Sequence, residues 1–200
     1  IAGINFSLHA QALRGVVKVY LRDRECRFYT VLLILGSAVI VAGLVEHGLF
    51  GMRSFPEFEA VTRAAVFQLV SVCTTTGFVS ENFNLWPSIT LVIILMFMLM
   101  GGCAGSTGGG VKVSTFTVIL VGMFSVMRGK KDITIGKRRI DHGTLVQALA
   151  VFVAYLVLTV TATLLINAIE PDRLNGEDFA SFSAVMFETV SAIGTVGLTQ

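Results

Sequence analysis

The chain has 200 residues, of which 54% are hydrophobic and only 14% charged, and its mean hydropathy is +0.80. Soluble domains carry about a quarter charged residues, so this composition excludes a soluble domain, a disordered chain and a coiled coil, and indicates a membrane protein. Cys26, Cys73 and Cys103 lie far apart without ligands at zinc spacing, which predicts free thiols and no metal centre.

The net charge of +2 conceals an uneven distribution of charges along the chain. Basic residues cluster within residues 1–27 and 128–144, and the positive-inside rule places both segments in the cytoplasm. Acidic residues concentrate around residues 46–58 and 167–178, which we expect outside, either as solvated loops or as a mouth that attracts cations. The basic loop has no interleaved aromatic residues, so we expect no nucleic-acid partner.

The first half of the chain contains one long and one short apolar segment. Residues 1–27 predict the end of a preceding helix and a cytoplasmic connection. Residues 28–45 form an apolar run of the length that crosses a bilayer, about 20 residues. Residues 59–72 predict a helix too short to cross, so this helix should enter the membrane and return.

The next apolar stretch, residues 87–127, is too long for one membrane helix. At about 1.5 Å per residue it would extend about 60 Å, twice what a bilayer needs. Six glycines within residues 101–110 predict the break. After the basic loop the pattern restarts, with a span at residues 145–166 and a short helix at residues 179–190.

This restart is an internal repeat. A shift of 120 residues aligns six identical residues within fourteen positions: Ala64, Phe67, Val70, Ser71, Thr75 and Gly77 with Ala184, Phe187, Val190, Ser191, Thr195 and Gly197. The chain therefore predicts two repeats of helix, re-entrant helix and turn, at residues 28–127 and 145–200, the second without its closing helix.

Each short helix is followed by a turn, at residues 74–78 and 193–198. Non-helical backbone inside a membrane is tolerated where protein buries it or where it lines a watery cavity. Both turns combine β-branched residues with glycine, which suits an extended backbone whose carbonyls replace the water around a cation. The alternative is a tight turn between helices without an ion, and the repetition favours the cation site.

Two other functions fit the glycine-rich segment less well. A phosphate-binding Walker loop needs lysine directly after its second glycine, whereas Val111 follows Gly110 and Lys112 comes one position late. A secondary transporter could present a broken helix and Lys112 to a small anionic solute at the membrane midplane. We favour the alternative that Lys112 neutralises nearby carbonyls or extends toward the cytoplasmic interface.

Taken together, the two turns, the glycine-rich block, the Asn5-Phe6-Ser7-Leu8-His9 opening and the Arg22-Asp23-Arg24-Glu25 segment resemble the Trk/Ktr/HKT superfamily of potassium transporters, in particular its Trk-type bacterial membrane subunit. Thr195-Val196-Gly197-Leu198 is similar to a shortened potassium-channel filter. The resemblance implies an all-α membrane protein with potassium-channel-like helix, pore-helix, helix repeats, re-entrant filter loops and a broken inner helix. The chain would be the third repeat and an incomplete fourth.

The resemblance also implies residue roles. The ion-binding filter residues would be Thr74, Thr75, Thr76, Gly77, Phe78, Ile193, Gly194, Thr195, Val196, Gly197 and Leu198. Potassium would bind the carbonyls of Thr75, Thr76, Thr195 and Val196. The gate loop would comprise Gly101, Gly102, Cys103, Ala104, Gly105, Ser106, Thr107, Gly108, Gly109, Gly110 and Lys112. We expect no enzyme activity and no cofactor, with potassium as the substrate.

Family resemblance further implies the location and the partners of the protein. We expect a bacterial inner-membrane protein surrounded by lipid and assembled as a homodimer. Its expected partner is a cytoplasmic ring of nucleotide-binding regulatory subunits that acts on the glycine-rich loop.

Overall fold

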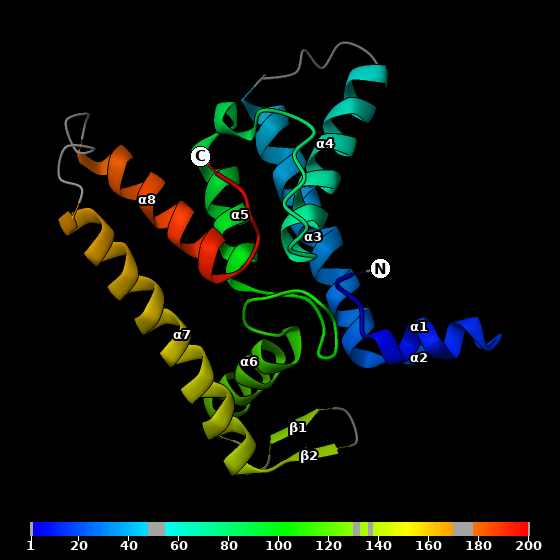
Figure 1. The fold of residues 1–200 in the computed structure, drawn as a ribbon. Coiled ribbons are helices and arrows are strands. Elements are labelled where there is room, and N and C mark those ends of the chain that lie inside the picture. The colour runs from blue at the N-terminus through cyan, green and yellow to red at the C-terminus, as the bar shows by residue number, and fades with distance from the viewer. Residues whose placement is uncertain (1, 48–54, 130–132, 136–137, 170–177, 200) are drawn as a thin grey trace.

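A computed structural model describes residues 2–47, 55–129, 133–135, 138–169 and 178–199, and these residues are mostly helical. The helices, in chain order, are α1 (Phe6–Leu13), α2 (Val19–Arg22), α3 (Arg24–Glu46), α4 (Phe55–Cys73), the 3-10 turn η1 (Phe83–Leu85), α5 (Ser88–Leu99), α6 (Val113–Met127), α7 (His142–Ile169) and α8 (Asp178–Ile193). The strands are β1 (Ile133–Ile135) and β2 (Arg138–Ile140). Figure 1 shows the arrangement of these elements.

Among the described residues, α3 and α7 are the two helices long and apolar enough to cross a membrane. They contain the spans expected at residues 28–45 and 145–166 and are longer at both ends. The start of α3 is set by Asp23, whose Oδ1 accepts a hydrogen bond of 2.7 Å from the backbone N–H of Cys26. This N-cap satisfies one of the four backbone donors left free at a helix start.

The two shorter helices, α4 and α8, are also longer than their sequence predicts. They were expected at residues 59–72 and 179–190 and extend over Phe55–Cys73 and Asp178–Ile193. Helix α4 packs on α3 and α5, while α8 packs on α7 and α5, so α5 contacts both short helices (Figure 1).

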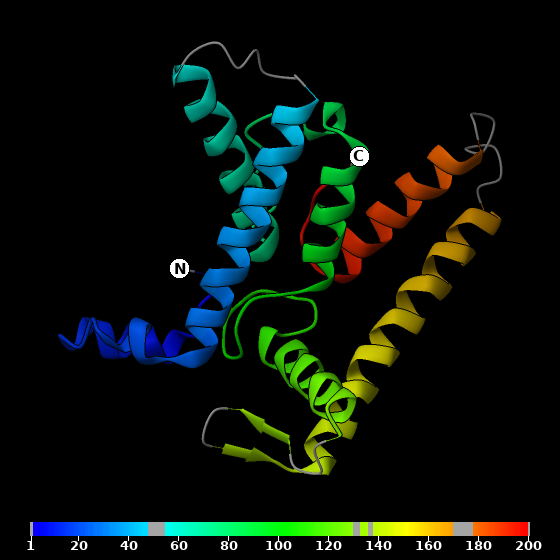
Figure 2. The same ribbon diagram turned by 180° about the vertical axis from the view of Figure 1, so that it is seen from behind.

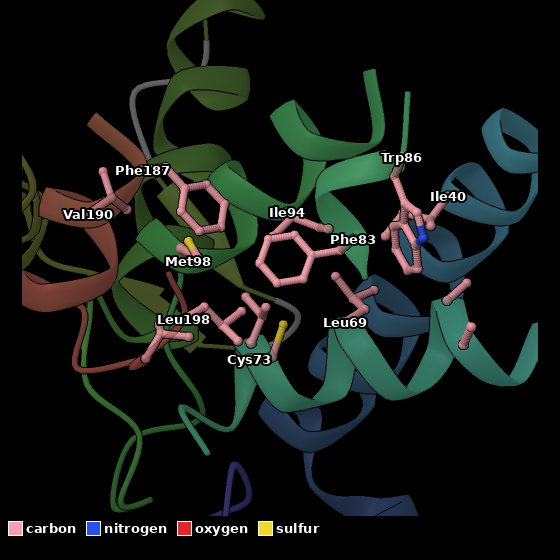
Figure 3. Close-up of a cluster of buried hydrophobic side chains, with 14 of the residues drawn as sticks. Ile40, Leu69, Cys73, Phe83, Trp86, Ile94, Met98, Phe187, Val190 and Leu198 are labelled. Atoms are coloured by element: carbon pink, nitrogen blue, oxygen red, sulfur yellow. The ribbon is translucent and has the colours of Figure 1, made fainter. Parts of the chain in front are cut away.

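A buried apolar cluster joins the two repeats (Figure 3). The rings of Phe83, from η1, and Phe187, from α8, stack with centroids 5.7 Å apart. Ile94 and Met98 of α5 lie in the same cluster and are fully buried. Such close packing and dispersion contacts are what hold helices together within lipid, where the solvent is as apolar as the side chains.

The long apolar stretch at residues 87–127 is interrupted, and the interruption is wider than residues 101–110. Helix α5 ends at Leu99 and α6 begins at Val113. Figures 1 and 2 show that α6 does not continue the axis of α5 and that the loop between them lies beneath the ends of α4 and α8.

Two segments expected to be connections contain regular structure. The basic loop expected at residues 128–144 contains β1 and β2, which pair antiparallel with Ile133 opposite Ile140. Its β-branched residues favour a strand, a signal masked by the charges around them. Residues 1–27 contain α1 and α2, which extend sideways from the first turn of α3 (Figure 2).

Close packing of α3 depends on Gly36. A Cβ at Gly36 would lie 2.8 Å from Leu69 of α4 and 2.7 Å from Phe97 of α5. We expect Gly36→Leu in the full-length parent to cost about 1–3 kcal/mol and to lower its unfolding midpoint in detergent by several degrees. The matched control is Ala38→Leu, which places the same leucine side chain on an exposed face of α3. Equal losses in both variants would contradict this packing role.

Candidate functional site

The turns after α4 and α8 have the same backbone hydrogen bonds. In the first, turn A (residues 74–78), Thr74, Thr75 and Thr76 donate to the carbonyls of Val70, Val72 and Ser71. In the second, turn B (residues 194–198), Gly194, Thr195 and Val196 donate to the carbonyls of Val190, Ala192 and Ser191. Each bond in turn A has its counterpart 120 residues later, so the sequence repeat is also a repeat of structure.

Turn B begins one residue later than predicted. Ile193, expected to be its first residue, is the last residue of α8. The helix extends further because the backbone of Gly194 still donates to Val190 at 2.8 Å, in the helical i to i−4 pattern.

Both turns contain a threonine in the left-handed backbone region. Thr75 has φ of 52° and Thr195 has φ of 57°, and these are the two residues other than glycine with positive φ in the described part of the chain. A β-branched residue in this region is strained by about 1–3 kcal/mol and persists where the surrounding structure enforces it. Such strain concentrates at functional sites, and here it occurs at the same position of both repeats.

A buried serine in the last turn of the preceding helix stabilises each turn. The Ser71 hydroxyl donates to the carbonyl of Phe78 at 2.7 Å, and the Ser191 hydroxyl accepts from the N–H of Leu198 at 2.9 Å. Each bond connects the last turn of a helix to the residue seven positions later. Ser71 and Ser191 were identified as repeat identities but not as site residues, because a buried serine can have many other roles.

The two turns lie side by side. A Cβ built on Gly77 would collide with the carbonyl oxygen of Val196, and Gly77 has φ of 68°. Turn B alternates along its length, with Thr195 and Gly197 exposed and Val196 and Leu198 buried. Leu198 packs in the apolar cluster with Cys73 of α4 (Figure 3). Turn B is therefore an extended segment with one buried and one open side.

The glycine loop (residues 101–110) closes on itself at its base. Met100 and Val111 form an isolated parallel bridge, and the N–H of Gly101 donates to the carbonyl of Val111 at 2.9 Å. A Cβ at Gly101 would collide with the carbonyl of Gly109, so the two sides of the loop are in direct contact. This close approach explains why glycine is needed at position 101.

Gly109, near the base of the glycine loop, contacts both turns. The N–H of Gly109 lies 3.4 Å from the Thr75 hydroxyl oxygen, its acceptor in turn A. A Cβ on Gly109 would collide with the Thr195 hydroxyl and the Gly194 carbonyl of turn B. The structure thus brings Gly109 into contact with both turns at once.

Lys112 lies at the end of the glycine loop, immediately before α6. Its ammonium donates a hydrogen bond to the carbonyl oxygen of Gly108. The side chain therefore neutralises part of the loop's backbone dipole and does not cap α6.

The described residues contain no group of three or more His, Cys, Asp and Glu side chains that could hold a metal ion. Cys26, Cys73 and Cys103 are free thiols and are buried. Oxygen atoms of the backbone and of threonine are thus the ligands that the two turns offer, and these suit a hard monovalent cation better than a transition metal.

Comparisons with known proteins find a matching family and relatives that align with almost the whole chain. The model of the family TrkH, described as cation transport protein, matches residues 1–200. The Ktr system potassium uptake protein B of Vibrio alginolyticus is 39% identical over 93% of this chain and 39% of its own length. The Trk system potassium uptake protein TrkH of Salmonella typhimurium is 31% identical over 93% of this chain and 38% of its own length.

A solved structure shares the fold. The crystal structure of the potassium transporter TrkH from Vibrio parahaemolyticus matches with a TM-score of 0.74 and 27% identity, over 93% of this chain and 40% of the other. The chain thus spans about two fifths of the length of these relatives. Both Trk system and Ktr system proteins match this chain. The chain belongs to the TrkH family of cation transport proteins.

Proposed function

We propose that this chain is part of a membrane subunit that carries potassium ions inward, and that turns A and B each supply one side of its selectivity filter. The observation that carries the proposal is the repeated turn geometry, with identical hydrogen bonds and strained threonines 120 residues apart. The relatives are named potassium uptake proteins, which supports potassium as the transported ion.

Potassium would replace its water shell with backbone carbonyls in the filter. The proposed ligands are the carbonyl oxygens of Thr75 and Thr76 in turn A and of Thr195 and Val196 in turn B. Helices α4 and α8 both end at these turns, so the partial negative charge at their C-termini favours a cation there. Transport needs no covalent step, and the chain has no proposed enzymatic role.

The filter would be completed by further segments of the parent protein. An open groove of about 700 Å³ lies beside turn A and is lined by Phe67, Ser71, Thr76 and Phe78 among others. Phe78 is 68% exposed, although it is a large apolar residue that follows the filter glycine. Two more repeats packed on this side would close the pathway and cover these side chains.

The glycine loop, together with Lys112, would act as the gate. It contacts turn A through Thr75 and turn B through Thr195, so a cation leaving the filter would meet Gly109 first. Glycines that let a loop change conformation are typical of such gating segments. The contact between Lys112 and Gly108 argues against the anion-transporter alternative, because the ammonium already has a partner.

The remaining proposals concern the membrane location, the orientation and the partners of the protein. The two apolar helices support a membrane location, and we propose the bacterial inner membrane, with residues 1–27 and 128–144 on the cytoplasmic side. The expected outer connections at residues 46–58 and 167–178 lie partly outside the described residues. The printed names "Ktr system" and "Trk system" are consistent with further subunits. We propose a homodimer with a cytoplasmic nucleotide-binding ring.

Rubidium uptake in a host that lacks its own potassium uptake tests the function. We expect the full-length parent to take up rubidium in competition with potassium, and Thr75→Ala to alter uptake, because the substitution removes the hydroxyl contact with Gly109. The exposed Ser80→Ala, just beyond turn A, is the control and should behave as wild type. Uptake of an anionic solute without rubidium uptake would move the assignment to the alternative.

A further inference from the structure

The edge of the glycine loop that faces α3 is bonded to the first residues of the described chain. Cys103 donates to the carbonyl of Gly3 at 2.8 Å, and Thr107 donates to the carbonyl of Ala2 at 3.2 Å. In return, the N–H of Phe6, at the start of α1, donates to the carbonyl of Gly105 at 3.0 Å. The loop thus has a second attachment, separate from its contacts with turns A and B.

A carboxylate completes this attachment. The backbone N–H of Ala104 donates to Oε1 of Glu25 at 2.7 Å, across 79 residues of sequence. Both residues are half-buried, which limits competition from water. Hydrogen bonds to an ionised acceptor are shorter and stronger than neutral ones, so this contact contributes most among the four.

The position of Glu25 is itself fixed. It lies in the first turn of α3, where Asp23 caps the helix through the N–H of Cys26. One turn later, buried Tyr29 packs against the segment that holds the loop, since a Cβ at Gly3 would collide with the Tyr29 hydroxyl. A rigid helix start therefore presents the carboxylate to the loop.

We infer that Glu25 is a positioning residue for the glycine loop, tying Ala104 to the start of α3 and so holding Gly109 beneath both turns. This inference rests on the proposed function of the loop as a gate. It connects the gate to the α2–α3 junction, the part of the fold on the proposed cytoplasmic side (Figure 1). Movement of this junction would release the loop without touching the filter.

The experiment measures N-ethylmaleimide alkylation in the full-length parent in membrane vesicles, quantified by mass spectrometry for the peptides that carry Cys103 and Cys73. Cys103 lies in the loop and is 1% exposed, while Cys73 ends α4 and is 2% exposed. Loss of the Glu25 contact should expose Cys103 alone, whereas general unfolding would expose both. Cys73 therefore serves as an internal reference.

We expect Glu25→Ala to accelerate alkylation of Cys103 by about tenfold, since a hydrogen bond to a charged group is lost, and Cys73 to stay protected. Glu25→Gln, which keeps an acceptor oxygen, should fall between Glu25→Ala and wild type. Asp23→Asn is the matched control, because it removes a neighbouring charge but retains a good N-cap. N-ethylmaleimide reacts with the thiolate, which nearby carboxylates disfavour, so any rise in Asp23→Asn measures the effect of a lost charge alone and should stay well below the rise in Glu25→Ala.

Unchanged alkylation of Cys103 in Glu25→Ala, or an equal rise at Cys73, would overturn the inference. Rubidium flux measured in the same vesicles distinguishes the positioning role of Glu25 from the proposed gating role of the loop. Faster alkylation with raised flux supports both proposals. Faster alkylation with wild-type flux supports the positioning role of Glu25 and contradicts the gating role of the loop.

Discussion

Replacing Gly77 with serine is expected to lower the ratio of potassium to sodium uptake by about tenfold or more in the full-length parent. Gly77 has φ of 68°, a conformation that costs a residue with a side chain about 1–2 kcal/mol. Its new Cβ would also collide with the carbonyl of Val196, one of the proposed ligands. Displacing that oxygen changes the coordination of the ion, and 1.4 kcal/mol of lost preference equals about tenfold.

The measurement is uptake of rubidium and sodium into proteoliposomes at matched protein content. The chain offers a matched control in Gly129→Ser, since Gly129 has a similar φ of 65° but no described residue beyond its chain neighbours lies within 4 Å of the place where a Cβ would lie. This variant has the same backbone strain without the collision and should keep the wild-type ratio. An unaltered ratio in Gly77→Ser would place Gly77 outside the filter.

Removal of residues 102–109 is expected to raise potassium flux through the parent by at least about tenfold. Gly109 contacts both turns, and the deletion removes it together with its neighbours in the loop. The remaining ends lie close together, because a Cβ at Gly110 would lie 3.1 Å from the backbone nitrogen of Gly101.

Flux is measured as rubidium efflux from proteoliposomes, where a closed gate limits the wild-type rate. Ser80→Ala, an exposed position outside the loop, is the control, since it leaves the loop intact. The control should retain the wild-type rate. A deletion variant that conducts no faster than wild type would show that the loop does not limit the passage of ions.

Much of the helical framework could be predicted because its signals are local. The length of the apolar runs gives α3 and α7, and six glycines give the break between α5 and α6. The sequence repeat at an offset of 120 residues identifies the two turns as equivalent without any structure. Helix ends were less well predicted, since α4 starts at Phe55 and α8 continues to Ile193.

Other features depend on tertiary contacts that no local pattern reports. Positive φ is expected at glycine, yet Thr75 and Thr195 adopt it, because hydrogen bonds to the preceding helix hold the turn. The hydrogen bond between Glu25 and Ala104 joins residues 79 positions apart. In the sequence, a charged residue within a basic segment indicates only on which side of the membrane the segment lies. Such a residue acquires its role only when the chain has folded.

Crystals of the full-length parent soaked with thallium would test whether turns A and B bind the ion, since thallium substitutes for potassium and scatters anomalously. We expect anomalous peaks beside turns A and B, within coordination distance of the carbonyl oxygens of Thr75, Thr76, Thr195 and Val196. Absence of any peak at both turns, in crystals that bind thallium elsewhere, would contradict the assignment of these turns to the filter.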